Sequence, residues 1–315
     1  MKKIALSLAF FASLACGNES ILGEFDNSTA QKMSGISFDA GMWYMTWDQT
    51  STASDMLLNS SDALDTTYNI ENSPAAVANL NMSYRYLSGN FEYYQNKDIS
   101  GMNLGLSLLE LIPYLNLEFR YVKADFKGDI ASKLSSGGAI SSGTFETKLD
   151  IADVIVYPFN EYIGFGYRTY KYEVPQDVYV INNSDGSLVA GGAGLIDISY
   201  EGSFYTAVLD NKRMVDTKTN YNGLVYSASF GIGKLKPKAS GYEEWITESD
   251  AQMFDILVGY SYKTKSDTGF GYGLGAGYRY NKIETTANKT SATYSLLTEF
   301  NTEFHGPFID VTISY

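Results

Sequence analysis

The single histidine of this 315-residue chain, His305, is the side chain best suited to move protons near neutral pH. A serine hydrolase would pair it with a serine in a G-x-S-x-G turn, and the sequence has no such turn. Asp310 follows in the same segment, but nothing in the sequence places a second acidic pair beside these two. We therefore predict no catalytic residues, and an enzyme is the least favoured of the functions considered below.

Cofactor chemistry has equally little support. Besides His305 there is one cysteine, Cys16, and no D-x-[DN]-x-[DN]-G calcium loop. In the stretch "GFGYGLGAGYRYN" (269–281), Gly271, Gly273 and Ala276 match the G-x-G-x-x-G/A dinucleotide fingerprint. That fingerprint must open a helix, whereas here glycine alternates with large residues in the period of a strand. We predict no cofactor and no metal site.

A set of charged residues shares a more informative feature. Each falls on the small, polar face of a segment whose opposite face is large and apolar, as in "YLNLEFRYV" (114–122). One hypothesis is a charged lumen that filters small solutes, and the other is that the charges pair with one another and fill a narrow barrel. The lumen-lining candidates are Arg85, Arg120, Arg168, Arg279, Glu118, Asp255 and Asp310.

The elements that would position these charges are antiparallel strands. Alternating segments are separated by short turns and by longer polar segments, and the 26 tyrosines often stand at segment ends, which favours a transmembrane β-barrel over a soluble sandwich. We predict about twelve strands, or ten if 90–110 is helical. Long surface loops are expected near 50–76, 127–143, 176–219 and 284–300, and 176–219 is long enough to hold its own hairpin. The strands are expected near 35–48, 77–87, 90–97, 101–110, 114–126, 144–157, 161–174, 220–232, 233–245, 251–264, 268–283 and 302–315.

One position disturbs the alternation. If Leu149 and Ile151 face lipid, the same face carries Asp153 into the bilayer, at a cost of a few kcal/mol. We predict a β-bulge near Ala152 that turns Asp153 inward and Val154 outward.

The N-terminus predicts export. Lys2 and Lys3 precede the apolar run "IALSLAFFASLA", so we predict a signal peptide at 1–17, with acylation of Cys16 as an alternative. The formal net charge of −13 argues against nucleic acid as a partner. No later apolar stretch approaches the ~18 residues that a membrane helix requires.

The chain ends in "FHGPFIDVTISY", in which Ile309, Val311, Ile313 and Tyr315 form one apolar face. This looks like the terminal strand of bacterial outer-membrane proteins, which the barrel-insertion machinery recognises by its aromatic last residue. More narrowly, the chain resembles a little-characterised family of proteobacterial outer-membrane β-barrel proteins. The resemblance rests on "IPYLNLEFRYVKADFKG", on "LDIADVIVY" followed by "YIGFGYRTYKYEV", and on "GLGAGYRYNKI". The resemblance implies location and architecture, and no reaction.

We therefore expect an all-β protein, an up-and-down transmembrane barrel over 18–315 in the bacterial outer membrane. Its expected partners are outer-membrane lipid and the insertion machinery. The leading functional hypothesis is a narrow porin-like channel for small solutes. The alternatives are a non-conducting structural or surface-interaction (adhesin-like) barrel and, less favoured, a barrel hydrolase. The sequence does not fix the oligomeric state.

Overall fold

The structure is a computed structural model that describes most of the chain after residue 33. The described residues are 34–53, 64–84, 87–112, 115–134, 139–158, 162–182, 184, 188–216, 218, 220–241, 248–265, 269–287, 294–297 and 301–315. The predicted signal peptide (1–17), Cys16 and Arg85 lie outside them. Over these ranges, no helix has both the length and the apolar character needed to cross a membrane.

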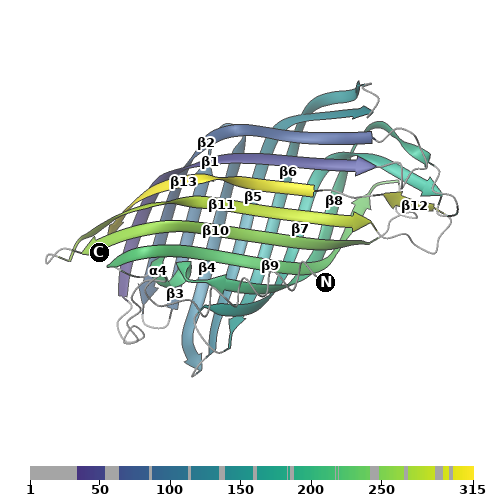
Figure 1. The fold of residues 1–315 in the computed structure, drawn as a ribbon. Helices are drawn as coiled ribbons and strands as arrows, with labels where there is room; N and C mark the ends of the chain where they lie inside the picture. The colour runs from purple at the N-terminus through teal and green to yellow at the C-terminus, as the bar shows by residue number, and fades with distance from the viewer. Residues whose placement is uncertain are drawn as a thin grey trace.

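The described strands belong to one antiparallel sheet that closes on itself through the pairing of β7 with β8. A short strand, β12 (Tyr294–Leu297), pairs with the tip of β7, which leaves twelve of the 13 strands in the barrel wall (Figure 1). The wall strands are β1 (Ser34–Ala53), β2 (Leu64–Tyr84), β3 (Leu87–Gln95), β4 (Ile99–Ile112), β5 (Leu115–Leu134), β6 (Ala139–Tyr157), β7 (Ile163–Asn182), β8 (Leu188–Asp210), β9 (Tyr221–Ala239), β10 (Ser249–Lys265), β11 (Gly271–Ala287) and β13 (Asn301–Ser314). The twelve-strand antiparallel barrel predicted from the sequence is confirmed.

The barrel has two sections, because the hairpin of β3 and β4 does not extend to the far end of the barrel. Past the tip of this hairpin, β2 pairs directly with β5, from Leu64–Asn69 to Asp129–Leu134. The wide section therefore has twelve strands around its wall, and the narrow section has ten. Both described chain ends lie in the wide section, where the backbone N–H of Ile36 donates to the carbonyl of Tyr315 (N···O 3.1 Å).

The outer face of the barrel changes character between the two sections. Around the wide section it carries exposed apolar side chains such as Phe38, Phe119, Val154, Leu274 and Ile313. On β1 this apolar series runs from Ile36 to Tyr44, which is about 26 Å along the strand and about 20 Å along the barrel axis at a tilt of ~40°. Around the narrow section the outward positions are polar, and many are charged, including Lys127, Glu146, Lys171, Glu201 and Lys236.

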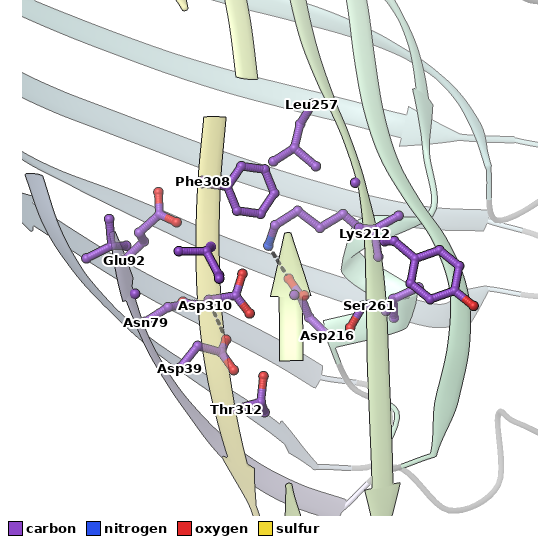
Figure 2. A pocket seen from close by; sticks show the side chains of 18 of the residues that line it. Asp39, Asn79, Glu92, Lys212, Asp216, Leu257, Ser261, Phe308, Asp310 and Thr312 are labelled. Atoms are coloured by element: carbon purple, nitrogen blue, oxygen red, sulfur yellow. Dashed lines mark hydrogen bonds and ion pairs between the residues drawn. The ribbon is translucent and has the colours of Figure 1, made fainter. Parts of the chain in front are cut away.

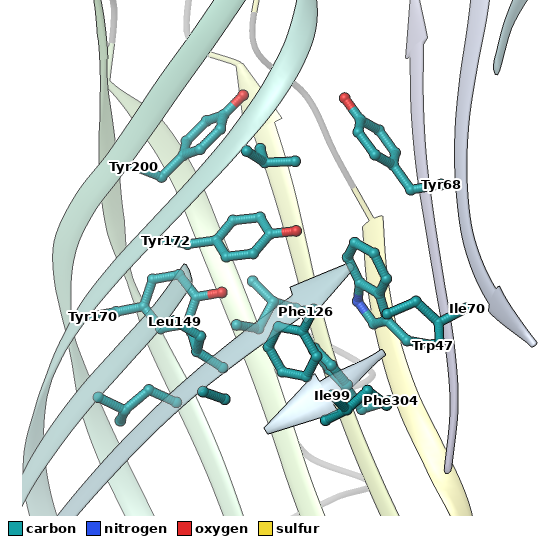
Figure 3. Close-up of a cluster of buried hydrophobic side chains, with 14 of the residues drawn as sticks. Trp47, Tyr68, Ile70, Ile99, Phe126, Leu149, Tyr170, Tyr172, Tyr200 and Phe304 are labelled. Atoms are coloured by element: carbon teal, nitrogen blue, oxygen red, sulfur yellow. The ribbon is translucent and has the colours of Figure 1, made fainter. Parts of the chain in front are cut away.

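The interior of the narrow section contains many tightly packed apolar side chains. Each of its ten strands contributes one buried apolar side chain to a set that we call the apolar layer (Figure 3). Trp47 lies at its centre, stacked on Phe126 (5.9 Å between ring centroids) and on Phe304 (5.6 Å). The layer consists of Trp47, Tyr68, Phe126, Phe145, Tyr172, Tyr200, Leu235, Met253, Ile283 and Phe304, all at most 7% exposed.

The wide section is apolar outside and polar inside, and the narrow section is polar outside and apolar inside. This inversion corrects the predicted β-bulge before Asp153. The pairing of β6 with β5 and with β7 runs through this stretch without a register shift, so the predicted bulge near Ala152 is wrong. Leu149, Ile151 and Asp153 all face inward. The alternation is unbroken, and only the medium that meets each face has changed.

The same inversion explains the errors in the predicted strands and loops. We expect 176–219 to be a surface loop that could hold a hairpin of "VYVI" and "SLVA". That hairpin is present, but it is formed by the end of β7 and the start of β8, and all of β8 belongs to the barrel wall. The two strands expected at 220–232 and 233–245 are one strand, β9, whose outward Lys234, Lys236 and Lys238 look like a polar turn in the sequence. Strands also extend into the expected loops 50–76, 127–143 and 284–300. The 90–110 region is strand and not helix.

The two-section wall predicts which outward positions water can reach. In a Cys16→Ser background, Glu146→Cys in the narrow section should react with a membrane-impermeant maleimide on intact cells, because it faces water. Val154→Cys on the same outward face of β6 should react only after the membrane is dissolved, because it faces lipid. Mass spectrometry of the isolated protein reports the labelled fraction, and equal labelling of the two thiols on cells would contradict the inversion.

Candidate functional site: the polar chamber

Below the apolar layer, the wide section encloses a polar chamber. Its cavity measures about 220 Å³ and is lined by charged side chains from seven wall strands and from the short helix α4 (Lys212–Asp216). The charged members are Glu92, Glu118, Arg120, Asp153, Arg168, Asp210, Lys212, Arg213, Asp216, Asp255 and Arg279.

Arg168 is the most deeply buried of the chamber arginines. It donates from Nε and Nη2 to the two carboxylate oxygens of Asp153 on β6, at 2.5 and 2.7 Å. Asp255 on β10 adds a second carboxylate at 3.6 Å. This two-point geometry is the one in which a guanidinium binds a carboxylate most strongly.

Arg120 joins two strands in the same way. It donates from Nε and Nη2 to the carboxylate of Glu118 (2.8 and 2.9 Å), and it also pairs with Asp210 at the end of β8. Glu118 further accepts a hydrogen bond from the buried Tyr157 hydroxyl (2.7 Å), and Asp210 accepts one from Ser227 (3.0 Å). The network therefore satisfies most of the polar atoms that it buries.

Arg279 on β11 reaches through the chamber to β3, four strands away around the wall. Its two terminal nitrogens donate to Glu92 on β3 at 2.8 and 2.6 Å, and the Asn103 amide donates to the same carboxylate (2.6 Å). The guanidinium lies 4.9 Å from the Trp43 ring centroid and 5.3 Å from that of Phe308. Each chamber arginine named here is thus neutralised by a carboxylate and held in one orientation.

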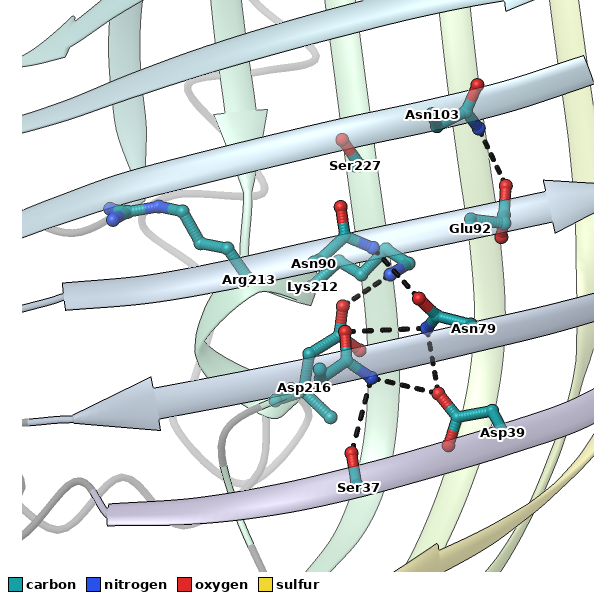
Figure 4. A network of polar contacts seen from close by, with 12 residues as sticks. Ser37, Asp39, Asn79, Asn90, Glu92, Asn103, Lys212, Arg213, Asp216 and Ser227 are labelled. Carbon is teal, nitrogen blue, oxygen red and sulfur yellow. Dashed lines mark hydrogen bonds and ion pairs between the residues drawn. The ribbon is translucent and has the colours of Figure 1, made fainter.

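Helix α4 lies at the wide end of the chamber, where Asp216 lines a small cavity together with Ser37 and Ser314. Figure 4 shows Lys212, Arg213 and Asp216 of this helix. Lys212 pairs with Asp216, and the Arg213 guanidinium lies 3.9 Å from the centroid of the Tyr157 ring. Burial by itself would lower the pKa of Lys212, but the carboxylates of Asp216 and Glu92 outweigh it and hold that pKa above its usual value. Lys263 on β10 donates to the Val215 carbonyl (3.2 Å), which ties the helix to the wall.

The structure places the sequence candidates as follows. Arg120, Arg168, Arg279, Glu118, Asp255 and Asp310 face inward, and Arg85 lies outside the described residues. The face formed by Ile309, Val311, Ile313 and Tyr315 is outward and exposed. His305 faces outward and Asp310 inward, so these two do not pair. Instead His305 Nδ1 lies 2.8 Å from the Tyr278 hydroxyl and its Nε2 lies 3.9 Å from Asp48.

Several chamber residues were missed. Glu92 alternates with the outward Phe91 and Tyr93, a signal that was available in the sequence. Asp210 and the charged residues of α4 were hidden within the segment that had been assigned to a surface loop. Nothing in the sequence shows that a connection between two strands folds back into the lumen.

The architecture defines a class. A closed antiparallel barrel with an apolar outer belt and a polar interior satisfies every backbone polar group inside a bilayer, and the chain is a bacterial outer-membrane β-barrel associated with membrane lipid. In such barrels the short turns face the periplasm. By this rule we expect the wide end, where two residues each join β2 to β3 and β4 to β5, to face the periplasm, and the narrow section to face the outside of the cell. Over the described residues, no group of three or more histidine, cysteine, aspartate or glutamate side chains is placed to hold a metal ion.

Comparisons with known proteins identify neither a family nor an activity for this chain. No protein-family model matches the chain, and no curated protein matches its sequence. Among solved structures, 90% of the chain aligns with 97% of the outer membrane protease OmpT from Escherichia coli at 8% identity and a TM-score of 0.31. It also aligns, over 96% of both chains, with a Pseudomonas aeruginosa FadL homologue at 8% identity and a TM-score of 0.34. A third match is the beta domain of the Bordetella autotransporter BrkA, with 87% of this chain aligned to 98% of that one at 10% identity and a TM-score of 0.29. At these values the likenesses carry no argument about activity.

The Arg168–Asp153 pair yields a stability prediction. Arg168→Met should lower the free energy of unfolding by about 3–5 kcal/mol, because it leaves Asp153 charged and unpaired in the interior. Adding Asp153→Leu should restore most of the loss. Lys171→Met, which breaks the exposed Lys171–Glu173 pair on the same strand, should cost less than about 1 kcal/mol.

Urea unfolding of the purified protein, followed by tryptophan fluorescence, measures these differences. If Arg168→Met and Lys171→Met proved equally stable, the pair would not anchor the chamber. A double variant no more stable than Arg168→Met would lead to the same conclusion.

Proposed function

We propose that this protein is a non-conducting outer-membrane barrel whose narrow section forms a packed platform at the cell surface for contact with molecules outside the cell. The observation that carries the proposal is the apolar layer. It receives a side chain from every strand of the ten-strand section, and its members are at most 7% exposed. Moving a charged solute through so tightly packed an apolar layer carries a prohibitive desolvation cost.

The narrow section is built as a water-soluble β-barrel would be. Its strands continue beyond the lipid belt with charged residues outside and packed rings inside, so the platform has a core of its own. Trp47, Tyr68 and Phe145 pack with ring centroids 5.0–6.2 Å apart. A rigid base of this kind suits the presentation of binding segments at the ends of its strands, as other scaffolds present binding loops.

A gated channel is the second candidate, and the polar chamber favours it. The chamber of about 220 Å³ has a partly exposed carboxylate at Asp255, as the lining of a solute path would. This function requires the apolar layer to open. For either candidate, we propose that the outward face of β13 is the part engaged by the barrel-insertion machinery.

The first prediction of the proposal concerns conductance. The purified protein in a planar bilayer should show no stepwise current, whereas Trp47→Ala/Phe304→Ala should conduct, because two stacked rings are removed from the layer. The control is Phe230→Ala/Phe254→Ala, which removes a contacting ring pair (4.9 Å between centroids) from the outer face and should show no stepwise current. Stepwise current from the wild type would overturn the proposal in favour of the channel.

The second prediction concerns the platform. Cells displaying the wild type should adhere to one another or to a coated surface more strongly than cells lacking the protein. Replacing residues 54–63 and 183–187, which connect β1 to β2 and β7 to β8, with glycine–serine segments of equal length should remove the gain. The barrel should still migrate as a folded, heat-modifiable band on gels. Adhesion that survives both replacements would count against a surface-interaction role.

A further inference from the structure

A second, smaller cavity adjoins the polar chamber. It measures about 70 Å³, lies between β1, β10, β13 and α4, and shares Glu92, Lys212 and Arg279 with the larger cavity (Figure 2). We call it the acidic cavity, because Asp39 and Asp310 both line it from neighbouring strands.

Asp39 has half of its carboxylate unsatisfied. The side chain is about nine-tenths buried, with 9% of its surface exposed. Its Oδ2 accepts hydrogen bonds from the amides of Asn79 (2.8 Å) and Asn81 (2.9 Å), while its buried Oδ1 receives none from any described residue. A buried carboxylate oxygen without a donor is costly, and native structures keep such atoms where something binds them.

Asp310 is the second carboxylate. In the paired register it lies between Gly41 on β1 and Gly275 on β11. A Cβ atom at Gly275 would stand 2.5 Å from Asp310 Oδ1, so a larger residue there would push the carboxylate from its place. Within the described part of the chain, Asp310 has neither a hydrogen bond nor an ion pair, and its oxygens face the cavity.

The cations around the cavity do not neutralise both carboxylates. Lys212 is paired with Asp216, and Arg279 is paired with Glu92. Lys263 donates to the backbone carbonyl of Val215. It therefore supplies one positive charge near the two negative charges of Asp39 and Asp310. The balance of one negative charge suits a monovalent cation, and the nearby ammonium groups of Lys212 and Lys263 disfavour a divalent ion.

The remaining wall has the chemistry of a small amphipathic site. Thr312 supplies a hydroxyl group near Asp39, and Ser261 supplies another from the β10 side, whereas Val225, Leu257 and Phe308 supply apolar surface. An ammonium group has three N–H donors and needs that many acceptors, and an attached hydrocarbon needs an apolar wall.

We propose that the acidic cavity binds a small primary alkylammonium ion that reaches it from the periplasm. The ammonium group donates to Asp39 Oδ1, to the Asp310 carboxylate and to a neighbouring hydroxyl, while the alkyl stem lies against Leu257 and Phe308. The apolar layer closes the opposite route, and α4 forms the periplasmic wall of the site. The site does not depend on whether the barrel conducts.

The test is isothermal titration of the purified full-length protein in detergent with n-butylammonium chloride. Tetramethylammonium chloride, which has the same charge and no N–H, and magnesium chloride are titrated in parallel. We expect saturable binding of butylammonium and binding of tetramethylammonium at least about tenfold weaker, because charged hydrogen bonds are lost. Asp39→Asn and Asp310→Asn should each weaken butylammonium binding about tenfold or more.

Asp255→Asn is the matched control, since it removes a partly exposed carboxylate elsewhere in the lumen and should leave the affinity within about twofold. Asp310→Asn breaks no ion pair, so it should fold even if Asp39→Asn does not. Three results would each overturn the proposal. These are no saturable binding to the wild type, unchanged binding to Asp310→Asn, or magnesium binding tighter than that of butylammonium and lost in the same variants.

Discussion

The structure depends on one constraint, which is that a β-strand shows alternate side chains to opposite faces and cannot change that alternation along its length without a bulge. The long strands of this barrel pass through two media on the outside, lipid and then water. Where the outer residues must be apolar, as at Val154, the inner ones are free to be polar, as at Asp153. Where the outer residues must be charged, as at Glu146, the inner ones can be apolar, as at Phe145.

This relation between the outer and inner faces divides the interior into two levels, one apolar and one charged. The upper level packs rings around Trp47 and resembles the core of a soluble protein. The lower level holds charges that would be costly to bury singly. It pairs Arg120 with Glu118 on the same strand, Arg168 with Asp153 on the neighbouring strand, and Arg279 with Glu92 across the lumen. Helix α4 adds further charges to that level from the periplasmic end. The acidic cavity stands out against this background, because its two carboxylates are the exception to the pairing.

The fold could be predicted from the sequence where the strands face lipid, because lipid requires an apolar residue at every second position. Segments such as 114–122 alternate large apolar residues with small polar ones, so the barrel and its number of strands were predicted, although β8 was missed and β9 was predicted as two strands. The narrow section was not predicted, because its exposed face carries charged residues. On β9, for example, the sequence around Lys234, Lys236 and Lys238 resembles a polar turn. The inward direction of Arg120 and Arg168 could be predicted, because alternate residues of a strand point to opposite faces. Their partners could not, since Asp210 lies 90 residues from Arg120 and meets it only after the barrel closes.

The sequence by itself determined which residues share a face, because parity is local and is fixed by backbone geometry. It also determined that the chain would close into a barrel suited to a membrane. The tertiary structure alone decided whether the lumen is open, because that depends on ten side chains from ten strands meeting at one level. It alone also decided which charges neutralise one another and which, at Asp39 and Asp310, are left facing a cavity. Ion pairing and packing act across strands, and strand order and stagger are properties of the closed barrel.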